Sequence, residues 1–181
     1  HHHTEKQGPH ERGEKAGENG GLDPHIWLSP PLVKKQIRTV LTALQEIDPS
    51  HRDVYAANFN QFVSRIDKLD AKLKTTFANQ QGLDFMVFHP SWGYFARAYG
   101  LAQIPIEIEG KTPKPGQLKE LIDYARKRGI KVVFVQPQFS AKSAALVAKE
   151  IDGQVVFTDP LAEDWLSNLN QVATKIKAAL E

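Results

Sequence analysis

The sequence predicts an α/β protein, in which a Rossmann-like parallel sheet domain is preceded by a long helix and further helical structure. Two observations predict this fold class. From residue 82 to the C-terminus, short and almost wholly apolar runs alternate with amphipathic segments, a pattern typical of parallel sheets covered by helices. Before residue 82, two long stretches repeat apolar residues at intervals of three and four, which is the period of a helix that buries one face.

The composition bounds the function classes. The chain has 181 residues, of which 41% are hydrophobic, and its formal net charge is only +2. Basic and acidic residues are interspersed, so no basic face is available for nucleic acid. The sequence contains no cysteine, so any metal must be held by nitrogen and oxygen ligands. It also contains no apolar run of the length that a membrane helix needs, and no secretory segment at its start.

Residues 1–21 read HHHTEKQGPHERGEKAGENGG. They are polar and rich in glycine, so they bury too little apolar surface to offset the entropy of ordering, and we expect a disordered loop. The opening His1, His2 and His3 fit either the remnant of a purification tag or a native histidine-rich loop.

Two helices are expected next. In residues 22–50, a turn at Asp23-Pro24-His25 precedes a helix whose apolar residues recur from Val33 to Ile47 and which stops at Asp48-Pro49. In residues 51–81, a second stripe runs for about six turns, through Tyr55, Phe59, Phe62, Ile66, Leu69, Leu73 and Phe77. A helix of that length is a structural strut.

Residues 82–181 form the sheet domain. The apolar runs predict strands at 85–88, 104–108, 132–135 and 155–157, with helices at 92–99, 118–128, 140–151 and 165–180. The glycine fingerprint of a dinucleotide site does not follow any of these strands, which disfavours a nucleotide cofactor.

Ligands of such a sheet collect at the carboxyl ends of the strands. The polar residues there are His89, Glu107, Glu109, Gln136, Gln138 and Asp159. An imidazole and a carboxylate at neighbouring strand ends suit a first-row divalent ion, and His25 can add a second imidazole. The residues alone leave two other interpretations open: His89 as a structural histidine that caps its strand or bonds a backbone carbonyl, and Asp159 as a turn-starting residue.

Four motifs read together carry a resemblance. In order, they are DPHIWLSP from Asp23, FHPSWGYFARAYGL from Phe88, PQFS from Pro137 and DPL from Asp159. So arranged, they resemble the ZnuA-like metal-binding proteins, which are periplasmic solute-binding proteins for zinc and manganese ABC importers. The resemblance covers nearly everything from Leu22 to the C-terminus.

The resemblance implies a metal held between two α/β domains that one long helix connects. Residues 22–50 would then be part of a second, N-terminal α/β domain, residues 51–81 the connecting helix, and residues 82–181 the C-terminal metal-binding domain. The implied ligands are His25, His89 and Asp159. Histidine at position 89, where manganese proteins of the family tend to carry glutamate, implies zinc. The implied role is zinc capture for the membrane permease of an ABC importer, outside the cytoplasm and without enzymatic activity.

The sequence also departs from the family pattern. The segment that would supply the family's first histidine ligand precedes the DPH motif and is not in this chain, so we expect an incomplete site with weak zinc binding. For the same reason His25 need not stay near the other ligands, and uncovered apolar helix surface favours self-association, a domain swap or collapse of the first helix onto the sheet. Gln136 stands where the family often has glutamate.

Two alternative functions stay open at this point. A metal-dependent hydrolase would need a general base near the metal, such as Glu107 or Glu109. An adhesin-type member of the same family would also bind a surface partner.

Overall fold

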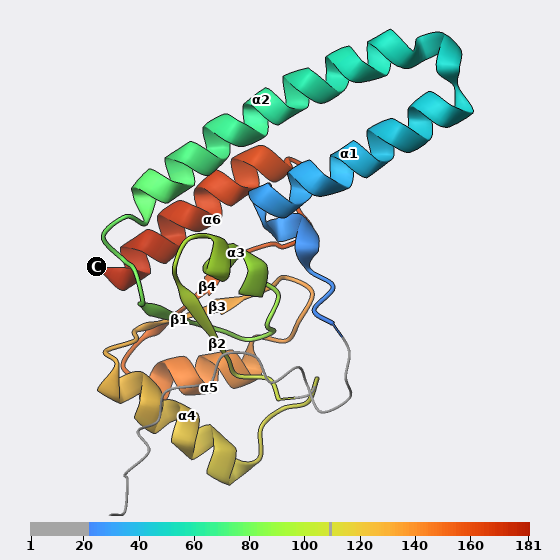
Figure 1. The fold of residues 1–181 in the computed structure, drawn as a ribbon. Helices are drawn as coiled ribbons and strands as arrows, with labels where there is room; N and C mark the ends of the chain where they lie inside the picture. Colours follow the sequence, from blue (N-terminus) through green and yellow to red (C-terminus); the bar gives the residue numbers. More distant parts are fainter. Residues whose placement is uncertain (1–21, 109) are drawn as a thin grey trace, which may run out of the picture.

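A four-stranded parallel sheet forms the centre of the molecule (Figure 1). The computed structural model describes residues 22–108 and 110–181. The strands are β1 (Asp84–Val87), β2 (Ala102–Pro105), β3 (Val132–Val135) and β4 (Gln154–Phe157), in the order β2-β1-β3-β4. The register pairs Asp84 with Ala102, Met86 with Val133 and Val133 with Val155. The α/β fold class with a parallel sheet is thereby confirmed.

Side chains that alternate along the strands build two apolar cores. Phe85, Val87 and Phe134 face the helices α2 (Arg52–Thr76), α3 (Gly93–Ala98) and α6 (Trp165–Leu180). Met86, Val133 and Val135 face α4 (Pro115–Lys127) and α5 (Lys142–Glu150). Figure 1 shows the resulting three layers, with α2 and α6 above the sheet and α4 and α5 below it. Burial on both faces explains why β1 and β3 read as unbroken apolar runs.

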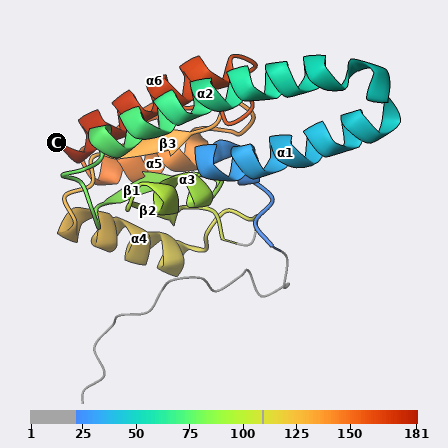
Figure 2. The same cartoon turned by 45° about the horizontal axis from the view of Figure 1, so that its top comes forward.

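Helix α1 (Pro30–Ile47) and α2 form a hairpin that extends beyond the sheet (Figures 1 and 2). Two short 3-10 turns, η1 (Ile26–Leu28) and η2 (Pro49–His51), flank α1. Pro30 and Pro31 begin α1, where a missing backbone N–H costs nothing. Helix α1 packs along α2, and the residues of α1 that are buried, Pro30 and Val33, lie at its start.

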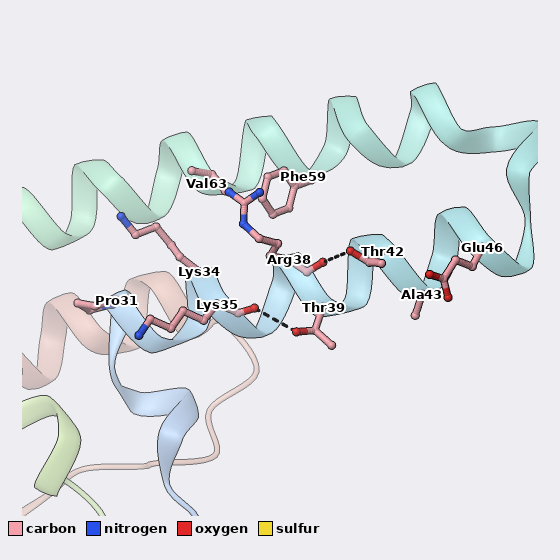
Figure 3. A pocket seen from close by; sticks show the side chains of 10 residues that line it. All are labelled: Pro31, Lys34, Lys35, Arg38, Thr39, Thr42, Ala43, Glu46, Phe59 and Val63. Atoms are coloured by element: carbon pink, nitrogen blue, oxygen red, sulfur yellow. Dashed lines mark hydrogen bonds between the residues drawn. The ribbon is translucent and has the colours of Figure 1, made fainter.

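The outer part of the hairpin leaves apolar surface uncovered. Val40 is 56% exposed and Ile47 is 82% exposed. Between the two helices lies a hollow of about 880 Å³, which Lys34, Lys35 and Arg38 line with threonines and with Phe59 (Figure 3). A smaller hollow of about 440 Å³ is lined by Ile37, Val40, Leu41, Leu44, Tyr55, Asn58, Phe59 and Phe62.

A buried polar contact joins α2 to the end of α3. Tyr99 donates its hydroxyl to Asp70 Oδ1 at 3.0 Å, and Lys74 Nζ lies 2.7 Å from Asp70 Oδ2. Tyr99 and Asp70 are 3% and 7% exposed. Burial, with the negative charge and hydrogen bond of Asp70, raises the pKa of Tyr99 above its ordinary value.

The structure moves several expected boundaries, and two of these shifts involve glutamine side chains. Strand β2 spans Ala102–Pro105 instead of the predicted 104–108. Gln103 in this strand faces the loop before α3, where its Oε1 accepts from Trp92 N at 2.9 Å and its Nε2 donates to Pro90 O at 3.3 Å. The long helix ends at Thr76, and Gln81 then bonds the carbonyls of Phe77 and Tyr99 in the following turn. Among the described residues, no helix is long and apolar enough to cross a membrane.

Candidate metal centre

The backbone of His89 is fixed at the carboxyl end of β1 by a buried side chain from the neighbouring strand. Gln136 directly follows β3 and is 1% exposed. Its amide Nε2 donates to His89 O at 2.8 Å and to Ser91 Oγ at 2.9 Å, while its Oε1 accepts from His89 N at 3.4 Å. The sequence pattern assigns no role to Gln136, whereas in the structure its side chain holds the loop that carries His89.

The imidazole ring of His89 is held on two sides. Nδ1 lies 2.9 Å from Glu107 Oε2, and Phe139 stacks on the ring with centroids 4.9 Å apart and planes at 23°. Glu107 follows β2, and its backbone N–H donates to Phe88 O at 3.0 Å. With Nδ1 occupied by a carboxylate, Nε2 is the ring nitrogen available to a metal.

His25 is held by a carboxylate in the same manner. Asp23 Oδ1 accepts from the backbone N–H of His25 at 3.0 Å and lies 2.6 Å from its Nδ1. Tyr94 of α3 donates its hydroxyl to Asp23 O at 3.2 Å, which fastens this turn to the sheet domain. The Asp-x-His spacing therefore forms an Asx turn and places the Asp23 carboxylate on Nδ1 of His25, so Nε2 is the ring nitrogen available to a metal.

The structure brings His25 and His89 together. Their ring centroids are 5.3 Å apart, in an edge-to-face arrangement. The expectation that His25 need not remain near His89 is therefore wrong. The physical reason is a pair of tryptophan hydrogen bonds: Trp27 Nε1 donates to Pro160 O at 2.9 Å, and Trp165 Nε1 donates to Trp27 O at 2.7 Å. These bonds lock the turn around His25 onto the segment after β4.

This segment contains the third candidate, Asp159. Its Oδ1 accepts from Leu161 N and from Gln138 Nε2, both at 2.9 Å. The first of these bonds is that of a turn-starting aspartate, the alternative that the sequence left open. Across residues 22–108 and 110–181, no three His, Asp or Glu side chains gather closely enough to hold a metal. The structure thus assembles a histidine pair with Asp159 at the same edge of the sheet.

A comparison with models of protein families shows to which family this chain belongs. The model of the family described as zinc-uptake complex component A, periplasmic (ZnuA) matches residues 1–179. The chain belongs to the ZnuA family. The resemblance seen in the four sequence motifs is thereby confirmed.

Curated relatives of this ZnuA-family chain include two bacterial proteins. The high-affinity zinc uptake system protein ZnuA of Bacillus subtilis is 31% identical over 132 residues, which cover 72% of this chain and 41% of that protein. The putative metal-binding protein of Chlamydia muridarum is 31% identical over 154 residues, which cover 84% of this chain and 56% of that protein.

Solved structures agree with this ZnuA assignment. A crystal structure of ZnuA is 48% identical with a TM-score of 0.88, and the match covers 91% of this chain and 64% of that one. The laminin-binding protein Lmb of Streptococcus agalactiae, described as having adhesin and metal transporting activity, is 25% identical with a TM-score of 0.83; coverage is 91% and 66%. The chain therefore spans less than two thirds of each of these four proteins.

Sequence reasoning missed the carboxylate partners of both histidines. It placed Glu107 at a strand end and offered it as a general base, but did not connect it with His89; the adjacency of β2 and β1 makes this contact, and no spacing in the sequence encodes it. Trp92 is 1% exposed and lies in the apolar core. Trp27 does border the site, with its ring centroid 5.3 Å from that of His25. Glu109 and residues 1–21 lie outside the described residues.

Proposed function

We propose that this chain carries the zinc-holding residues of a solute-binding protein that captures zinc outside the cytoplasm and delivers it to the permease of an ABC importer. The proposed ligands are His25, His89 and Asp159. The observation that carries the proposal is the histidine pair: two imidazoles from distant parts of the chain lie with ring centroids 5.3 Å apart, and a carboxylate occupies Nδ1 of each. Metal-binding histidines in proteins are typically oriented in this way.

Zinc is the metal that this donor set favours. Neutral imidazole is a borderline ligand that suits zinc, whereas manganese prefers carboxylate and carbonyl oxygens. A related ZnuA structure is described as having zinc bound, and it is 47% identical over 92% of this chain. Asp159, at the same edge of the sheet, is the third proposed ligand, and its Oδ1 bonds Gln138 in the structure. A tetrahedral zinc shell has four ligands, so these three side chains leave one position to be filled.

We propose metal capture without catalysis for this site, in preference to the alternative of a metal-dependent hydrolase. A hydrolase would need a free base beside a metal-bound water, yet Glu107 Oε2 is engaged with His89 Nδ1 at 2.9 Å. Tight holding for transfer to a transporter needs only the ligands. We accordingly propose the transporter permease as the protein partner, and a periplasmic or extracellular location.

Zinc titration by calorimetry, with a competing chelator, tests the ligands. His89→Ala should weaken zinc binding at least tenfold, which corresponds to about 1.4 kcal/mol, and zinc should displace manganese. His51→Ala is a matched control, because His51 Nδ1 also lies 2.7 Å from a carboxylate, that of Asp48, but at the exposed hairpin tip. Equal affinity of both variants for zinc, or a preference for manganese, would contradict the proposal.

A further inference from the structure

Glu107 has an unusual position for a carboxylate. Its side chain is 8% exposed, and its Oε2 lies 2.9 Å from His89 Nδ1. A buried carboxylate is costly unless it is paired. The backbone holds it in place, since Ile106 N donates to Val87 O at 2.8 Å and Glu107 N to Phe88 O at 3.0 Å. The Glu107 carboxylate is therefore held in a fixed position relative to the His89 imidazole.

We propose that Glu107 is a positioning residue that keeps His89 in the tautomer with its proton on Nδ1, so that the lone pair of Nε2 faces the metal. This inference rests on the proposed function for its purpose. A neutral imidazole carries one proton, on one of its two nitrogens. With the proton on Nε2, the Nδ1 lone pair would face the oxygen of Glu107 at 2.9 Å and be repelled. The carboxylate therefore selects the proton position before any metal arrives.

The other neighbours of His89 hold the ring in place but do not determine which of its two nitrogens carries the proton. Phe139 stacks on its face and His25 meets its edge, while Gln136 bonds only its backbone. Glu107 is therefore the group, among the described contacts of this ring, that distinguishes Nδ1 from Nε2.

Three histidine–carboxylate pairs occur among the described residues, and they differ in burial. The side chains of His89 and Glu107 are 27% and 8% exposed, those of His25 and Asp23 are 15% and 34% exposed, and those of His51 and Asp48 are 62% and 37% exposed. Water screens an exposed pair more strongly than a buried one. The most buried carboxylate belongs to His89, so control of the tautomer should be strongest there.

The direct test is the nitrogen-15 spectrum of the histidine rings in the metal-free chain, at about pH 8.5, where imidazole is ordinarily neutral. His89 should show a protonated Nδ1, whereas an exposed imidazole mostly carries its proton on Nε2. A wild-type His89 with the proton on Nε2 overturns the proposal. This readout needs neither a variant nor zinc, so it remains decisive even if the chain proves not to bind zinc.

Two variants then measure what the tautomer contributes to binding. Glu107→Gln keeps a carbonyl acceptor and should retain the Nδ1 proton, with only a few-fold loss of zinc affinity. Glu107→Met removes the acceptor; the proton should move to Nε2, and zinc affinity should fall 10- to 100-fold, the usual effect of losing such a partner. The control is Asp48→Asn, which alters the exposed pair at the hairpin tip and should change nothing. Unchanged tautomer and affinity in Glu107→Met would refute the assignment.

Discussion

Replacing Tyr99 with phenylalanine tests the polar contact that joins α2 to the sheet domain. The substitution removes one hydroxyl and leaves the aromatic ring in the core. Asp70 Oδ1 then loses its 3.0 Å donor and keeps only Lys74, which reaches the other oxygen at 2.7 Å. Because Asp70 is 7% exposed, water cannot easily replace the lost donor.

The expected cost follows from the charge and burial of Asp70. A hydrogen bond to a charged group contributes about 1.5–3 kcal/mol, and a buried group left unpaired costs the upper part of that range. For a chain of this size, 1 kcal/mol shifts the midpoint of thermal unfolding by about 2–4 °C. We therefore expect Tyr99→Phe to lower the midpoint by about 3–12 °C.

Urea denaturation followed by circular dichroism measures this change as a free energy of unfolding. Tyr55→Phe is the matched control, since Tyr55 also donates to an aspartate, Asp48 Oδ2, at 2.8 Å. That contact lies at the exposed hairpin tip, where water can replace the lost donor, so its loss should lower the free energy of unfolding far less. Equal effects of the two variants would refute the argument that burial decides the strength of the bond.

The remaining predictions concern pH, a turn, the N-terminal segment and the hairpin. Because the pKa of Tyr99 is raised, this residue stays protonated in the folded state. Its contribution to the free energy of unfolding is therefore fully present below about pH 10, where the folded and the unfolded chain are both protonated. The free energy of unfolding should fall above that pH, as the unfolded chain ionises first, and less steeply in Tyr99→Phe. Gly100→Ala should cost more than Gly129→Ala in urea titration: both have positive φ, but a Cβ at Gly100 would lie 1.7 Å from Gln81 Oε1, whereas Gly129 faces open space. Deleting residues 1–21 should leave the zinc affinity of the proposed site unchanged in calorimetry; a large loss of affinity would show that their histidines are ligands. Light scattering should show self-association through the exposed apolar residues of the hairpin, which Val40→Lys should weaken; a monomeric wild type would contradict it.

The sequence by itself determined the fold class and the order of the elements. Every residue from Val132 to Val135 is buried. An unbroken apolar run of this kind predicts a strand reliably, because both faces of a central parallel strand are covered. The last helix occupies residues 165–180, as its apolar period predicts. The sequence predicted β2 less well, because polar Gln103 lies outside the predicted run of 104–108 although it pairs with Phe85 in the sheet.

The sequence also named the residues of the candidate site, but only the tertiary structure decided how they meet. His89 and Asp159 were found because parallel strands present their carboxyl ends at one edge. The position of His25 depends on the hydrogen bonds of Trp27 and Trp165, and the partner of His89 depends on the neighbouring strand. Both contacts join residues far apart in the chain. Local pattern reports which face of an element is apolar, whereas packing between elements determines which polar side chains come within bonding distance.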